Sequence, residues 1–84
     1  MEWFVYIAQT ASGKYYTGIT TSIEKRIEKH NKGKGAHLAI THGSFKLVYL
    51  SSGFKEKSQA RKREIQIKGW SRVKKELLIN KKWK

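Results

Sequence analysis

Residues 15–35 read YYTGITTSIEKRIEKHNKGKG, and the rest of the chain is organised around this segment. It begins as a strand over 15–20, in which Gly18 predicts a β-bulge or a close approach of the backbone. Thr21-x-x-Glu24 fits a capping box, the start signal of a helix. Isoleucines four residues apart, at 23 and 27, predict a helix over about 22–31 with one buried stripe. A basic glycine loop follows at 32–35.

Within that helix, Arg26 and His30 are also four residues apart, so both lie along one edge of the buried stripe. The strand before the helix ends close to the helix start, which aims Tyr16 at the same region. A tyrosine, an arginine and a histidine gathered in this way indicate a phosphate ligand.

The charge of the chain is strongly basic and unevenly distributed. Its 84 residues carry 19 Lys and Arg against 6 Asp and Glu, a formal net charge of +13. Residues 1–52 hold 7 basic and 3 acidic residues, and residues 53–84 hold 12 and 3. Such a surface favours nucleic acid over anionic lipid, because each phosphate contact releases counterions and no basic amphipathic membrane helix is evident.

The length allows one small domain, and the absence of cysteine excludes disulfides and cysteine-based zinc sites. No stretch has the roughly 18 apolar residues of a membrane span and no secretory signal opens the chain, so we expect a cytoplasmic location.

Hydrophobic patterns along the chain predict the element order β-β-α-β-α-α. Residues 3–8 are apolar on both faces, which is typical of a central strand, and residues 10–13 form a turn into the strand at 15–20. A third strand is predicted at 45–50, and a helix at about 55–68 that Gly69 closes. A last helix is predicted to be capped by Ser71 and to end near Ile79. In that helix Val73 and Leu77 are four residues apart, the spacing of a buried stripe. Residues 36–41 suggest a short helical turn. We therefore predict an α+β fold, a small α/β sandwich with a three-stranded antiparallel sheet flanked by helices, over 1–80, and a basic tail over 81–84.

One residue interrupts the pattern of the helix at 55–68. Ala60, Glu64 and Ile67 fall on one face, so a carboxylate lies in an apolar stripe. A buried carboxylate is costly unless it is paired or holds a metal. From the pattern alone, an ion pair with Arg26 or a neighbouring lysine is the simpler explanation. Taken singly, the tyrosines also fit core aromatics, and His30 fits a surface histidine.

Taken together, these residues resemble the GIY-YIG nuclease superfamily, and in particular its small stand-alone bacterial members. The resemblance covers nearly the whole chain and has five anchors in order: Tyr6 in Phe4-Val5-Tyr6, Tyr16 in Tyr16-Thr17-Gly18 ten residues later, Arg26 ten residues beyond, His30, and Glu64. Residues 67–79 look like the tail of the small subfamily.

The resemblance implies a metal-dependent DNA endonuclease or nickase acting in DNA repair or processing. Glu64 would hold one divalent cation, Mg²⁺ or Mn²⁺, weakly without substrate. Tyr16 would act as general base, or with Tyr6 in a hydroxyl network, while Arg26 would bind the phosphate and His30 would polarise a tyrosine or protonate the leaving group. The expected nucleic-acid-binding residues are Lys14, Lys32, Lys34, Arg61, Lys68 and Arg72. We expect the catalytic side chains to converge on one concave face, and Glu64 on the sheet face opposite Tyr16 would contradict the nuclease function.

Two other functions remain open at this stage. Many relatives carry an asparagine in a Pro-x-x-Asn context after the metal glutamate, whereas this chain has Lys74-Lys75-Glu76 there and no proline. That departure, with the minimal size, is compatible with a nucleic-acid-binding module that has weak or absent catalysis. A basic protein that binds RNA or a ribosomal surface is the third possibility. The expected partner is DNA, structured or single-stranded, rather than RNA or a membrane.

Overall fold

The structure is a computed structural model that describes residues 1–31 and 45–80. Its elements are β1 (Phe4–Thr10), β2 (Tyr15–Thr20), α1 (Ile23–Asn31), β3 (Phe45–Leu50), α3 (Lys57–Lys68) and α4 (Arg72–Ile79). The predicted α+β class and the order β-β-α-β-α-α are confirmed. The predicted turn at 36–41 and the tail at 81–84 lie outside the described residues, so the domain boundary at residue 80 stays a prediction.

The three strands form one antiparallel sheet in the order β2-β1-β3. Strand β1 is central, as its apolar residues on both faces predict. Directly opposite residues of two antiparallel strands share a face, and Tyr6 pairs with Gly18 while Ala8 pairs with Tyr16. These four residues therefore lie on one face of the sheet, and the alternate residues of β1 and β2 lie on the other face.

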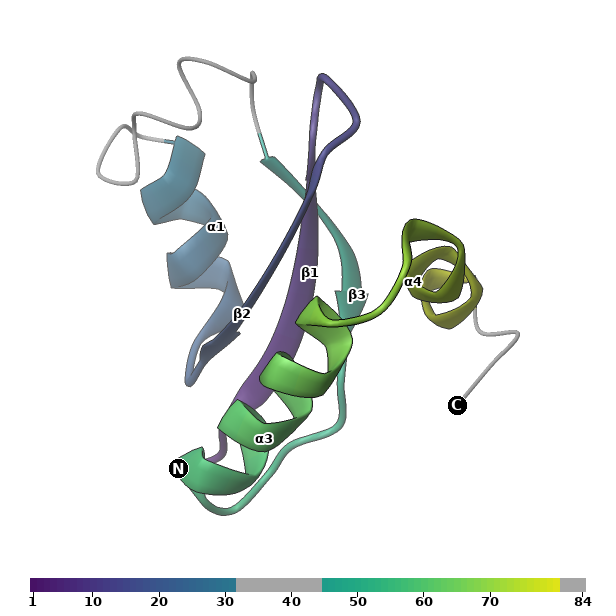
Figure 1. Cartoon of the computed structure of the whole chain (residues 1–84). Helices are drawn as coiled ribbons and strands as arrows, with labels where there is room; N and C mark the ends of the chain where they lie inside the picture. Colours follow the sequence, from purple (N-terminus) through teal and green to yellow (C-terminus); the bar gives the residue numbers. More distant parts are fainter. Residues whose placement is uncertain (32–44, 81–84) are drawn as a thin grey trace.

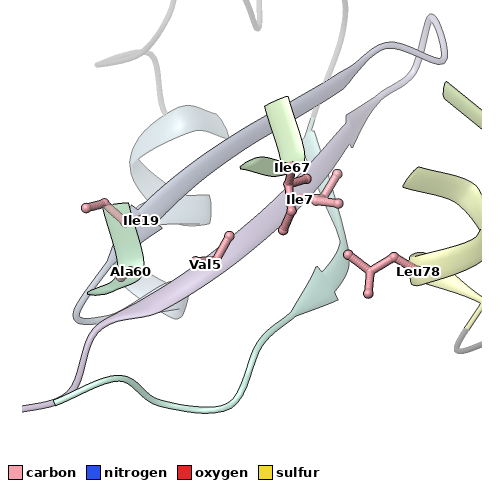
Figure 2. Packing of buried hydrophobic residues seen from close by; sticks show 6 residues of the cluster. All are labelled: Val5, Ile7, Ile19, Ala60, Ile67 and Leu78. Atoms are coloured by element: carbon pink, nitrogen blue, oxygen red, sulfur yellow. The ribbon is translucent and has the colours of Figure 1, made fainter. Parts of the chain in front are cut away.

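Each face of the sheet is covered by different helices (Figure 1). Helix α1 packs Ile23 and Ile27 against the face that carries Tyr6. Helices α3 and α4 pack on the opposite face, where the largest buried cluster consists of Val5, Ile7, Ile19, Ala60, Ile67 and Leu78 (Figure 2). Burying such aliphatic side chains contributes about 1.5–3 kcal/mol each. The two cores flank the sheet, so its edge strand β2 is the place where side chains from both layers can meet.

Helix α1 begins one residue later than the predicted capping box requires. The helix starts at Ile23, and the carbonyl of Ser22 accepts the amide of Arg26 at 3.1 Å, so Ser22 precedes the first turn. The hydroxyl of Thr20 accepts the Ser22 amide and donates to the Ser22 carbonyl, both at 3.1 Å. Those two bonds fix the turn ahead of the helix and leave Thr21 outside it. The Thr21–Glu24 box is therefore wrong.

The starts and ends of the last two helices are set by local polar groups. Glu56 and Gln59 form a reciprocal capping box at the start of α3, and Gly69 closes that helix as predicted. Ser71 caps α4 by accepting the amide of Lys74 at 3.3 Å, also as predicted. These caps satisfy amides that have no partner within the helix.

The buried face of α4 differs from the i, i+4 pattern in the sequence. Val73 is 66% exposed and Leu77 39% exposed, whereas Leu78 is 4% exposed. Helix α4 is short and contacts the sheet mainly through β3, so one turn of side chains near its C-terminus reaches the core. The i, i+4 spacing identified a helix but not the side that packs.

Candidate active site

A pocket of about 280 Å³ lies at the edge of the sheet formed by β2. It is lined by Trp3, Tyr6, Gly18, Ile19, Arg26, Lys57, Arg61 and Glu64. Gly18 and Ile19 are consecutive in β2 and so belong to opposite faces of the sheet. Because both line the pocket, the pocket extends around the strand edge and takes residues from both layers. Tyr6, Arg26 and Glu64, three of the five predicted catalytic residues, are brought together here from β1, α1 and α3.

The absence of a side chain at Gly18 creates the path that Tyr6 follows to this edge. A Cβ placed on Gly18 would lie 2.6 Å from the hydroxyl oxygen of Tyr6 and 2.8 Å from its ring Cζ. The Tyr6 ring therefore lies directly across β2 at this point. The sequence predicted a bulge or a close backbone approach at Gly18, and the structure shows a close approach by a side chain.

The Tyr6 hydroxyl is held in its protonated form. Burial raises the pKa of Tyr6 above its ordinary value of 10.0, the positive charge of Arg26 lowers it in part, and the carboxylate of Glu64 raises it further. Both charges act on Tyr6, which agrees with their shared pocket. The raised pKa keeps the Tyr6 hydroxyl protonated at neutral pH.

Glu64 is buried in the wall of the pocket, with 4% of its surface exposed, and both of its oxygens have cationic partners. The Arg61 Nη1 donates to Oε1 at 3.1 Å, and the Lys68 Nζ lies 3.1 Å from Oε2. Both cations are on the same helix, three and four residues away. Of the two predicted ion pairs, with Arg26 or with a neighbouring lysine, the one with a lysine is confirmed as Lys68, and Arg61 is a further partner.

The same arrangement is compatible with a divalent cation. The side chains of Arg61 and Lys68 are 52% and 54% exposed, so either cation can turn into water and release a carboxylate oxygen. Among residues 1–29 and 45–80 there is no group of three or more His, Cys, Asp or Glu side chains that could hold a metal together. Glu64 is the acidic residue among those that line this pocket, and water and substrate would supply the other ligands.

Tyr16 does not line this pocket. It lies on the α1 face of the sheet, diagonally across from Tyr6, and its ring packs edge-to-face on Phe45 with centroids 5.5 Å apart. Cross-strand diagonal neighbours are within reach of aromatic side chains, so Tyr16 adjoins Tyr6. Glu64 comes from α3 on the opposite face, so the expectation of one concave face for the whole set is wrong. This placement was expected to contradict a nuclease, but that expectation did not foresee that one pocket reaches around the edge of β2 to both faces. The pocket at the strand edge is what reunites Tyr6, Arg26 and Glu64. His30 lies in α1, where its side chain is outside the described residues.

Sequence reasoning missed two residues of the pocket. Trp3 and Lys57 both line it, and the Lys57 Nζ lies 5.2 Å from the centroid of the Trp3 ring. Lys57 precedes Arg61 by four residues and Glu64 by seven, a spacing that puts all three on one side of α3. That periodicity could have identified Lys57. Trp3 has no comparable signal, since it lies before β1 in an isolated bridge with Phe54.

The predicted nucleic-acid-binding residues divide between two pockets. Arg61 lines the Glu64 pocket, and Lys68 reaches it through its ion pair with Glu64. Lys14 and Arg72 line a second pocket, of about 270 Å³, between the start of β2 and α4. The Lys32–Lys34 loop lies outside the described residues.

Comparison with known protein families shows the family to which this chain belongs. A family model described as "GIY-YIG catalytic domain" matches residues 2–76. The chain belongs to the GIY-YIG family. The members of this family are nucleases, so the substrate class is nucleic acid, and they generally use a divalent metal. The pocket residues that the GIY-YIG anchors predict, Tyr6, Arg26 and Glu64, all fall within the matched range.

The GIY-YIG chain is similar to small UPF0213 proteins of bacteria. It is 42% identical over 82 residues to UPF0213 protein BH0048 of Halalkalibacterium halodurans, which covers 98% of this chain and 86% of the relative. It is 46% identical over 77 residues to UPF0213 protein SSP2268 of Staphylococcus saprophyticus, covering 92% and 93%. The solution NMR structure of the UPF0213 protein BH0048 from Bacillus halodurans has a TM-score of 0.60 at 41% identity, covering 95% of this chain and 84% of that one. Within the described part of the chain, no helix is long and apolar enough to span a membrane.

Proposed function

We propose that this protein is a divalent-metal-dependent endonuclease or nickase that hydrolyses phosphodiester bonds of DNA, in DNA repair or processing. The observation that carries the proposal is the pocket at the β2 edge, where Tyr6, Arg26 and Glu64 line one space of about 280 Å³. The proposal takes residues 1–80 as the nuclease-like domain, residues 81–84 as a basic tail, and the cytoplasm as the location.

Glu64 is the residue that would hold one Mg²⁺ or Mn²⁺ ion, through the oxygen released by Arg61 or Lys68. When bound, the ion would supply positive charge that stabilises the phosphate and the leaving oxygen. A single carboxylate gives weak affinity in the absence of substrate, because Mg²⁺ in open sites depends on water and phosphate oxygens. The ion pairs of Glu64 lower the affinity for the cation further, because either Arg61 or Lys68 must release a carboxylate oxygen before the cation can bind it.

The other pocket residues bind and orient the phosphate. Arg26 stays charged at all physiological pH values and can donate two parallel hydrogen bonds to phosphate oxygens. Tyr6 lines the same pocket, and its raised pKa keeps the hydroxyl protonated. A tyrosine base would have to lose its proton, which is disfavoured for Tyr6 by burial. We therefore assign the base role to Tyr16, acting directly or through water with Tyr6 as its neighbour.

A nicking assay tests the proposal. Purified protein is incubated with supercoiled plasmid, single-stranded DNA and branched DNA, with Mg²⁺, Mn²⁺ or EDTA. We expect nicking with metal and none with EDTA. Glu64→Gln should lose nicking and keep DNA binding, because the amide retains the size of the side chain without the charge that holds the cation. The matched control is Glu24→Gln, which changes an exposed carboxylate of α1 in the same way. Equal nicking by wild type and Glu64→Gln would contradict the catalytic role of Glu64.

The second candidate function is nucleic-acid binding without catalysis. It is favoured by one observation, the pairing of both Glu64 oxygens with cations at 3.1 Å. A carboxylate that served only to hold Arg61 and Lys68 in place on α3 would present those cations to a phosphate. This function predicts DNA binding with no nicking under any metal. In that case Glu64→Gln would change binding but have no activity to lose.

A further inference from the structure

The second pocket, which we call the β2–α4 groove, is defined by Lys14, Tyr15, Tyr16, Arg72 and Lys75 and has a volume of about 270 Å³. Lys14 precedes β2, the two tyrosines begin β2, and Arg72 and Lys75 come from the first turn of α4. Segments far apart in the sequence thus place two aromatic rings and three cations around one small space. None of these residues lines the Glu64 pocket.

The arginine of this groove is held in position by its neighbours. The Arg72 guanidinium carbon lies 4.3 Å from the centroid of the Tyr15 ring, and its Nε is 3.7 Å from Oε2 of Glu76. The Tyr15 hydroxyl donates to the same Glu76 oxygen at 3.3 Å. A fixed guanidinium loses less conformational entropy on binding than a mobile one, and the remaining N–H groups of Arg72 can donate to a ligand.

The charge around the groove selects an anion. Lys14, Arg72 and Lys75 carry three positive charges, and Glu76, paired with Arg72, is the carboxylate that the structure places against them. The groove therefore keeps an excess of positive charge. Placing like charges together is unfavourable without an anionic partner. A chain of phosphates provides such a partner at several points at once.

Both tyrosine rings of this groove already have packing partners. Arg72 covers one side of the Tyr15 ring, and Tyr15 also packs against the buried cluster around Val5 and Ile7. Tyr16 packs on Phe45. Sequence-independent recognition of nucleic acid backbones relies on phosphate contacts, whereas base recognition needs open aromatic faces or groove contacts. The chemistry of the groove thus fits backbone phosphates rather than bases.

Strand β2 joins the groove to the Glu64 pocket, since residues 15 and 16 line the former and residues 18 and 19 the latter. With a rise of about 3.3 Å per residue, Tyr15 and Ile19 are about 13 Å apart along the strand. A single DNA strand can therefore span both pockets with a few nucleotides.

We propose that the β2–α4 groove binds the sugar-phosphate backbone of the same DNA strand whose scissile phosphate lies in the Glu64 pocket, without regard to base sequence. This inference rests on the proposed function for the identity of the substrate. The groove would fix the direction in which the strand crosses the β2 edge. It is a positioning site, in which the three cations Lys14, Arg72 and Lys75 hold the backbone and take no part in the chemical step.

The test is a binding titration of the full chain in EDTA, with a fluorescein-labelled DNA single strand, followed by fluorescence anisotropy. Lys14→Gln/Lys75→Gln removes two charges from the groove. The matched control Lys29→Gln/Lys46→Gln removes two exposed charges, from α1 and β3. Each lost contact to single-stranded DNA should reduce the log–log salt slope by about 0.7, so the groove variant should lose about 1.4, with an affinity loss above about tenfold at 50 mM salt. The control should change affinity less than about threefold.

Two further measurements keep the interpretation unambiguous. Lys14→Arg/Lys75→Arg should restore the slope, which shows that charge and not folding was lost. Two strands of different sequence should bind equally. Equal losses in the groove variant and the control would overturn the proposal. If the groove variant loses binding selectively but wild type does not nick, the proposed nuclease function fails and the groove stands. If nicking requires Glu64 but the groove variant behaves like the control, the groove fails and the function stands.

Discussion

Gly18→Ala should destabilise the protein, because the new methyl group would occupy the space of the Tyr6 ring. The added Cβ would lie 2.6, 2.8 and 2.9 Å from three Tyr6 atoms, all inside van der Waals contact. Tyr6 is only 5% exposed and so cannot move aside into water. Overpacking of this kind costs about 1–3 kcal/mol, and the lower chain entropy of alanine returns about 0.4–1 kcal/mol. We expect a net loss of about 1.3 kcal/mol, or about 5–10 °C in Tm for a domain of this size.

Gly53→Ala is the matched control for this substitution. Its Cβ would lie 2.5 Å from the carboxylate end of Glu2, which is exposed and flexible, so the cost should stay below about 0.5 kcal/mol. A second control is the double variant Gly18→Ala/Tyr6→Leu, in which the shorter side chain leaves room for the methyl group. Thermal melts of wild type, Gly18→Ala, Tyr6→Leu and the double variant give the coupling free energy between the two sites. A Tm for Gly18→Ala within about 2 °C of wild type, or a loss that persists beside Tyr6→Leu, would refute the reasoning.

Three further outcomes are expected. Burial raises the pKa of Tyr6 above 10.0, so the folded state holds that proton more tightly than the unfolded state does. The resulting stability is complete below pH 10 and is lost as the pH rises above it, by up to about 1.4 kcal/mol per pH unit. Thermal melts of Tyr6→Phe should therefore show a smaller loss of Tm at alkaline pH than melts of wild type. Glu64→Gln should lower stability by about 1–2 kcal/mol, because the two cations that pair with it are half-exposed and regain water; a loss of 3–5 kcal/mol in urea unfolding would instead indicate stranded buried partners. Leu78→Ala should cost about 2–5 kcal/mol and Val73→Ala less than about 0.5 kcal/mol by the same method, and the reverse order would contradict the packing of α4.

Much of the site was predictable because helical periodicity is a local property. The spacing of Ala60, Glu64 and Ile67 put a carboxylate on a buried face, and these are the three buried residues of α3. The apolar character of residues 4–8 identified the central strand in the same way. The anchors Tyr6, Arg26 and Glu64 came from the resemblance to the GIY-YIG family, and they line one pocket.

Local pattern failed where the outcome depended on which surface another element covers. Val73 and Leu77 have the spacing of a buried stripe, yet α4 packs through Leu78, because its approach to β3 is set by the chain before it. The start of α1 was misplaced by one residue because Thr20 bonds both backbone groups of Ser22. Competing hydrogen bonds of nearly equal strength are difficult to rank from sequence.

The sequence by itself determined the six described elements, their order, the central position of β1 and the excess of positive charge, since each depends on residue types at fixed local spacing. Tertiary structure decided where the functional groups meet. Tyr6 and Glu64 belong to opposite layers, and they share a pocket because β2 is an edge strand whose Gly18 lets a tyrosine ring cross it. Tertiary structure also set Tyr15 beside α4 to form a second basic groove, whereas Arg61 and Lys68 pair with Glu64 through local helical spacing within α3. The shared pocket and the groove depend on how layers stack in space, which no spacing along one chain specifies.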